Sequence, residues 1–123
     1  MLIVEEKILE VYLEEDDKKM QSLQRLCHQL AKEKGFWDEK QRNKGELLML
    51  VVSELGEALE ALRKGNRQKL GEEWRKDTFE DELADAIIRL LDLAESENVD
   101  MNWQIFNKLD YNKTREHKHG KKF

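Results

Sequence analysis

Four acidic residues form two pairs with the same spacing. Glu54 and Glu57 lie three positions apart in the sequence SELGEA. After 24 further residues, Glu82 and Asp85 repeat that spacing in ELAD. At the helical repeat of about 100° per residue, positions i and i+3 lie on the same face. Each pair is therefore predicted to present two carboxylates from one side of a helix.

Charge continues along the second of these segments. Every residue of the stretch LADAIIRLLDLA is apolar except Asp85, Arg89 and Asp92. With Glu82, these three follow the spacing i, i+3, i+7 and i+10, which is one narrow stripe of a helix. A helix that is apolar on its other sides is normally buried, so the charged stripe is predicted to have partners inside the protein.

A divalent metal ion is the expected partner. Two helices joined by a short connection pack antiparallel and can bring the four carboxylates together. Four buried anions without compensation would be driven to protonate, and Arg89 offsets only one of these charges. Ligation by oxygen alone favours Mg²⁺ first and Mn²⁺ second over zinc. Magnesium in turn implies a substrate that carries phosphate.

Two other interpretations explain the pattern less well. Single acidic pairs are common on the exposed faces of helices, but two matched pairs within apolar segments are less expected there. A di-iron carboxylate bundle requires Glu-x-x-His on two helices. Only Glu116 and His119 have that spacing, and they lie in the basic C-terminal tail.

The elements that position these residues are all predicted to be helices. The chain has no Pro, and residues that favour helices dominate its composition. We expect an all-α bundle of four to five helices and no sheet. Its helices should cover residues 17 or 18 to 34, 46 to 64, 80 to 95 and about 101 to 114.

Local signals support these helix ends. Gly35 and Gly65 are placed to end the first two helices. Thr78, followed three residues later by Asp81, forms a capping box before the third helix. Asp100 or Asn102 is expected to cap the last one. The acid-rich residues 1–17 are predicted to be a helical extension, with Ile3, Ile8, Val11 and Tyr12 as its apolar contacts, and residues 18–123 a single domain.

The single cysteine and the N-terminal sequence indicate a cytoplasmic protein. Cys27 has no partner in the chain for a disulfide and is predicted to be a buried apolar thiol. The opening MLIVEEKILEVYLEEDD has too short an apolar run and too many acids for a signal peptide or a membrane span. We therefore expect no membrane partner.

The net charge of −5 is unevenly distributed. Residues 108–123 contain six Lys or Arg against two acids, so the tail carries +4 and the rest of the chain −9. A nucleic-acid-binding domain usually presents a basic face, which this acidic body lacks. The distribution favours a small anionic ligand over nucleic acid.

Several stretches resemble the MazG-like all-α nucleoside triphosphate pyrophosphohydrolases. They are LLMLVVSELGEALEALRKGN, FEDELADAIIRLLDLAE and NKLDYNKTREHKHGKKF, and the resemblance covers roughly residues 23–123. It implies a helical bundle that forms a homodimer or homotetramer and binds Mg²⁺. It also implies hydrolysis of a nucleoside triphosphate to the monophosphate and pyrophosphate. The metal ligands carried over from the family motif would be Glu54, Glu57, Glu82 and Asp85.

The resemblance also suggests a general base for the attacking water and residues that contact the substrate. Several relatives have a second acid, proposed as the base, where this chain has Ser53, which leaves Glu57 as the candidate. The tail would supply phosphate contacts, and Trp37 would stack on the nucleobase. The tail residues in question are Lys108, Asn112, Lys113 and Arg115, with Lys108, Asn112 and Arg115 expected on one helical face.

Each of these residues also has an interpretation as a purely structural or solvent-exposed residue. The tail is otherwise a solvated basic segment, and Trp37 a packing or dimer contact. His28 is expected to be a partly buried structural histidine, and Trp74 and Trp103 to lie in the core or an interface. At the level of function, hydrolysis of dUTP or phosphoribosyl-ATP would use a similar cluster within the superfamily. A non-catalytic helical interaction module is the alternative from another class.

Overall fold

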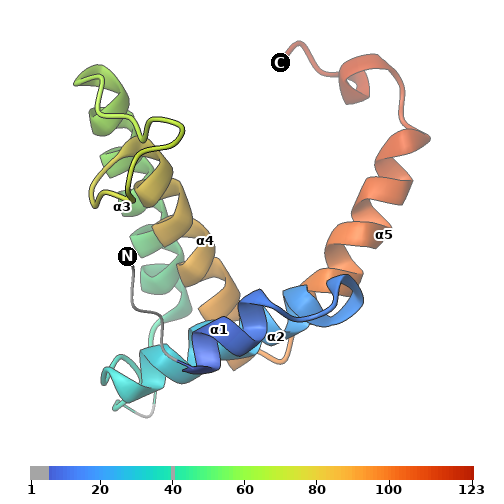
Figure 1. Cartoon of the computed structure of the whole chain (residues 1–123). Helices are drawn as coiled ribbons and strands as arrows, with labels where there is room; N and C mark the ends of the chain where they lie inside the picture. Colours follow the sequence, from blue (N-terminus) through green and yellow to red (C-terminus); the bar gives the residue numbers. More distant parts are fainter. Residues whose placement is uncertain (1–5, 40) are drawn as a thin grey trace.

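The computed structural model describes residues 6–39 and 41–123, and all regular elements among them are helices (Figure 1). The prediction of an all-α protein is confirmed. The elements are α1 (Glu6–Tyr12), α2 (Asp16–Glu33), α3 (Lys44–Arg63), α4 (Phe79–Ser96), α5 (Met101–Lys113) and a short 3₁₀ helix (His117–Gly120).

The helix ends follow the predicted signals to within two residues. Thr78 Oγ1 accepts the N–H of Asp81 at 3.1 Å and caps α4, and Asp100 caps α5 by the same geometry. Gly35 follows α2 with φ +86°, a left-handed conformation that glycine adopts without a steric penalty. α3 begins two residues earlier than expected, because the side chain of Asn43 caps it.

α3 and α4 form an antiparallel pair, and α2 packs across α4 (Figure 1). An ion pair of 3.1 Å joins Lys44, at the start of α3, to Glu97, just after α4. α5 leaves from the far end of α4 and points away from both helices of the pair, contacting α2 instead. Its start is held by Gln24 of α2, which donates to the Val99 carbonyl at 2.6 Å and accepts the Met101 N–H at 3.3 Å.

The core is small and lies where α2, α3 and α4 meet. Alanines at the α3–α4 contact allow the two backbones to approach closely, and larger side chains fill the remaining space. Its buried apolar residues are Leu26, Cys27, Leu47, Val51, Ala58, Ala61, Ala86, Leu91 and Ala94. Cys27 is buried as predicted, and burial, together with the charge of Asp92, raises the pKa of its thiol to about 11.

One side of the α3–α4 pair remains open, and we call it the outer face. On α3 each of its residues follows a buried one by one position, and so do Leu83 and Ile87 on α4, which turns them about 100° away from the helix contact; Leu90 lies one turn beyond Ile87 on the same side. They are Leu48, Val52, Leu55, Leu59 and Leu62 on α3 and Leu83, Ile87 and Leu90 on α4, all between 37% and 50% exposed except Ile87 at 54%. The single chain therefore leaves apolar surface uncovered on this side.

The N-terminal segment is less regular than expected. Of the four predicted apolar contacts, Ile3 lies outside the described residues, and Tyr12 is 69% exposed. α1 packs on α2, with an ion pair of 3.2 Å between Lys7 and Glu33. Among the described residues, no helix combines the length and the apolar character needed to cross a membrane.

Candidate metal centre and adjoining cavity

Three of the four predicted carboxylates converge between α3 and α4. Glu54 and Glu82 are only 9% and 5% exposed, because each lies on the face of its helix that packs against the other. One oxygen each from Glu54, Glu82 and Asp85 lies within 4.8 Å of the others, a spacing that can hold one cation. The fourth acid, Glu57, is more exposed and lies at the edge of this cluster, where its charge acts on Glu82.

The cluster carries more negative charge than the protein compensates. Burial, followed by the adjacent carboxylates of Glu57, Glu54 and Asp85, raises the pKa of Glu82 to about 7. Burial and then the charges of Asp81 and Glu54 also raise the pKa of Asp85. A cation bound between these groups would relieve both effects.

Arg89 neutralises one member of the cluster. Its Nε donates to Glu54 Oε1 at 2.9 Å. Burial alone would raise the pKa of Glu54, but this hydrogen bond and the others around the carboxylate lower it below its usual value. Glu54 is therefore held ionised and oriented toward the remaining acids.

One carboxylate oxygen of Glu82 is not satisfied within the described part of the protein. Its Oε2 is buried and has no hydrogen-bond partner among the described residues. A buried carboxylate oxygen normally finds a donor or a cation, because its desolvation is otherwise uncompensated. The oxygen-only donor set suits Mg²⁺ or Mn²⁺.

Asp92, the last charged residue of the α4 stripe, contacts Trp37 and His28. Its Oδ1 accepts from Trp37 Nε1 at 2.9 Å and lies 2.8 Å from His28 Nδ1. The rings of His28 and Trp37 meet edge to face with centroids 5.1 Å apart, and the guanidinium of Arg42 lies 5.0 Å from the Trp37 ring centre. His28 is partly buried and holds a structural contact, as predicted. Trp37 has a fixed orientation.

An open cavity of about 880 Å³ is lined by two carboxylates of the cluster, Glu54 and Asp85, and by this aromatic group. Glu54, Asp85 and Arg89 line one part, and Phe36 and Trp37 line another. From Asp85 to Asp92 the α4 backbone rises seven residues, or about 10.5 Å. The cavity therefore offers a charged region and an aromatic region at a separation comparable with the length of a nucleotide.

The tail residues predicted to contact phosphate do not line this cavity. Lys108, Asn112 and Lys113 are on α5, which points away from the carboxylates of its own chain (Figure 1). Arg115 follows the end of α5, so it is not on the helix itself, but its guanidinium and the Lys108 amine both lie over the Tyr111 ring, 5.6 and 5.0 Å from its centre. Asn112 and Arg115 line a separate pocket of about 620 Å³ with Lys118 and other tail residues. Their role as phosphate contacts stays a prediction.

Sequence reasoning missed the cations of the cavity. Lys34, Arg42 and Lys76 all line it, although they come from three different connections or helix ends. No spacing rule links residues so far apart, and only packing brings them together. Trp74 and Trp103 are 57% and 59% exposed, so neither lies in the core of the single chain.

Comparisons with protein-family models, with curated proteins and with solved structures find no match to this chain. Fold and site define it as an all-helical protein with a buried carboxylate cluster suited to a metal ion. Any narrower assignment rests on the chemistry of the cavity and on the motifs in the sequence.

Proposed function

We propose that this chain is a Mg²⁺-dependent nucleoside triphosphate pyrophosphohydrolase of the MazG-like type. It would convert a (d)NTP and water to the (d)NMP and pyrophosphate, a nucleotide-pool cleansing reaction in the cytoplasm. The observation that supports this most is the cavity that is lined both by Glu54 and Asp85 of the carboxylate cluster and by the aromatic rings of Phe36 and Trp37. A nucleoside triphosphate needs both, because its phosphates require cations and its base a flat apolar surface.

The residues of the cluster have different proposed roles. Glu54, Glu82 and Asp85 would hold the metal, and Arg89 keeps Glu54 ionised and oriented. Bound Mg²⁺ supplies a lowered pKa for the attacking water and offsets charge on the phosphate oxygens. Glu57, at the exposed edge, is the candidate to accept the proton of that water.

Ser53 does not replace the missing acid of the family motif. Its hydroxyl donates to the Leu50 carbonyl at 2.6 Å, within its own helix. A hydroxyl also has a far higher pKa than a carboxylate and is a poor general base at neutral pH. Glu57 is the most exposed carboxylate of the motif, whereas Asp85 is half-buried and Glu54 and Glu82 are buried.

The nucleobase of the substrate would lie against Trp37 and Phe36. Asp92 fixes the edge of the Trp37 ring, and Arg42 covers part of one face, so the base would use the other face or displace the guanidinium. The arrangement of these side chains does not favour one nucleobase over another. Hydrolysis of dUTP or phosphoribosyl-ATP by the same carboxylate cluster is therefore part of this proposal.

The proposed enzyme is a homodimer or homotetramer. The outer face presents eight apolar side chains with no cover from the described part of the chain, and a second α3–α4 pair is a matching surface. Because α5 points away from its own cluster, Lys113 and Arg115 can contact phosphate only in the site of another copy.

A non-catalytic interaction module is the second candidate. The outer face and the exposed aromatic residues of α5, Trp103 and Phe106, favour it, because such surfaces mark protein interfaces. It gives no reason for the buried, unpartnered oxygen of Glu82. We therefore place it second.

A nucleotide panel tests the proposal. Each canonical and modified (d)NTP is incubated with Mg²⁺, Mn²⁺ or EDTA, and released pyrophosphate is measured as phosphate after adding inorganic pyrophosphatase. We expect metal-dependent release that Glu82→Gln abolishes and that Glu73→Gln, a change at an exposed loop acid, leaves intact. Absence of turnover for every nucleotide with both metals would refute the enzyme and favour the interaction module.

A further inference from the structure

Lys76 is a cation at the carboxylate part of the cavity that the known motifs do not include. It lines the same cavity as Glu54 and Asp85. Its amine forms no ion pair with any acidic residue in the described ranges.

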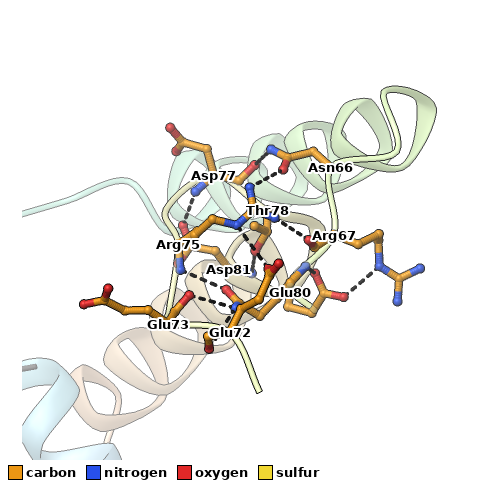
Figure 2. A network of polar contacts seen from close by, with 10 residues as sticks. Asn66, Arg67, Glu72, Glu73, Arg75, Asp77, Thr78, Glu80 and Asp81 are labelled. Carbon is orange, nitrogen blue, oxygen red and sulfur yellow. Dashed lines mark hydrogen bonds and ion pairs between the residues drawn. The ribbon is translucent and has the colours of Figure 1, made fainter. Parts of the chain in front are cut away.

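The backbone on both sides of Lys76 is held in place (Figure 2). Before it, the Arg75 N–H donates to Gln68 Oε1 at 2.8 Å. After it, the Asp77 N–H donates to Asp81 Oδ2 at 2.8 Å, and the Asp77 carbonyl accepts from Asn66 Nδ2 at 2.8 Å. Asp77 has φ +67°, a left-handed conformation that Asp adopts more readily than most other non-glycine residues.

A second set of bonds ties this loop to the first turn of α4. Glu80 accepts from Arg67 Nε at 2.7 Å and from the Gln68 N–H at 2.8 Å (Figure 2). Both bonds join the connection before α4 to the first turn of that helix. The backbone position of Lys76 is thus set relative to the helix that carries Glu82 and Asp85.

The position of Lys76 relative to the carboxylates follows from the order of residues along α4. It lies two residues before Thr78, the N-cap, and Asp85 follows Thr78 by seven residues, or about 10.5 Å along the helix. Asp92 and its partner Trp37 lie a similar distance beyond Asp85. Lys76 and the aromatic group are therefore on opposite sides of the carboxylates.

We propose that Lys76 binds the β- and γ-phosphates of the substrate, which leave as pyrophosphate. This inference rests on the proposed function for the identity of the substrate, but the pyrophosphate site itself is testable without turnover. With the base at Trp37 and the reacting α-phosphate at the metal, the two terminal phosphates extend toward Lys76. The amine would donate to their oxygens and balance charge that one divalent ion leaves uncompensated.

Calorimetric titration with magnesium pyrophosphate tests the site on the full-length protein. We expect Lys76→Ala to weaken binding ten- to a hundredfold, the usual effect of losing one charge-assisted hydrogen bond. Lys76→Arg should recover most of that loss. Lys69→Ala, a change on the same loop outside the cavity lining, should stay within twofold of wild type. Circular dichroism verifies that each variant is folded.

Turnover and product inhibition separate the two proposals. Lys76→Ala should lower kcat/KM for the triphosphate by a similar factor while leaving inhibition by the nucleoside monophosphate unchanged, since that product lacks the terminal phosphates. Pyrophosphate affinity that is unchanged in Lys76→Ala, or undetectable in the wild type, overturns the role of Lys76. An active wild type with an unaffected Lys76→Ala leaves the proposed function standing. Pyrophosphate binding that needs Lys76, without turnover of any nucleotide, refutes the enzyme and keeps the site.

Discussion

Replacing Glu82 by Gln tests the electrostatic account of the cluster without any assumption about the substrate. The substitution keeps the shape of the side chain and removes its charge. In the wild type without metal, the pKa of Glu82 is raised, so its carboxyl keeps a proton more tightly in the folded chain than in the unfolded chain. As the pH rises from about 4.5 to about 7, the unfolded chain loses this proton first, and folding becomes less favourable.

The size of the effect follows from the two pKa values. The pKa of Glu82 rises from 4.5 to about 7, and at about 1.4 kcal/mol per pKa unit its ionisation opposes folding by at most about 3 to 4 kcal/mol. Since Glu57 at the edge of the cluster is exposed, water screens part of the repulsion. We expect Glu82→Gln to be about 1 to 3 kcal/mol more stable than wild type at pH 8 and within about 0.5 kcal/mol of it near pH 4.

Urea unfolding in EDTA, followed by circular dichroism at one protein concentration, measures the difference between the two proteins at each pH. Comparing them at the same pH cancels the titration of all other groups. Glu73→Gln, at an exposed position, should match wild type at both pH values. Addition of Mg²⁺ at pH 8 should stabilise wild type more than Glu82→Gln, because only the wild-type cluster keeps all its ligands.

Two results would refute this reasoning. A Glu82→Gln variant less stable than wild type at pH 8 in EDTA would mean that the carboxylate makes a favourable contact within the protein. A stability difference that does not change between pH 4 and pH 8 would mean that Glu82 ionises in the folded chain as readily as in the unfolded one.

Three further predictions concern other parts of the molecule. Asp85→Asn should lower Mg²⁺-dependent turnover at least a hundredfold with unchanged helical content by circular dichroism, and activity within threefold of wild type would contradict its role as a ligand. Asp92→Ala should destabilise the protein by about 1 to 3 kcal/mol in urea unfolding, because Trp37 Nε1 loses its acceptor; a change below about 0.3 kcal/mol would show that the contact is dispensable. Leu55→Glu on the outer face should convert an oligomer to a monomer in light scattering, whereas Leu70→Glu, at a fully exposed loop position, should not. A wild type that is already monomeric at micromolar concentration would contradict the homo-oligomer.

The sequence by itself determined the helices and the faces of the acidic residues. Caps such as Thr78 and terminators such as Gly35 act within a few residues, so they are visible without any tertiary information. The spacing of Glu54 and Glu82 within apolar segments placed them on the faces of α3 and α4 that meet. Local rules suffice here because a helix repeats at a constant angle per residue.

Tertiary structure alone decided what surrounds those carboxylates. Arg42, Lys76 and Trp37 reach one cavity because α2, the two connections and the α3–α4 pair pack together, and no local spacing encodes that meeting. The direction of α5 likewise depends on contacts made by Gln24 of α2, 75 or more residues away along the chain. Side-chain contacts between distant segments depend on how whole helices cross, and that geometry is set by the packing of the complete core rather than by any one stretch of sequence.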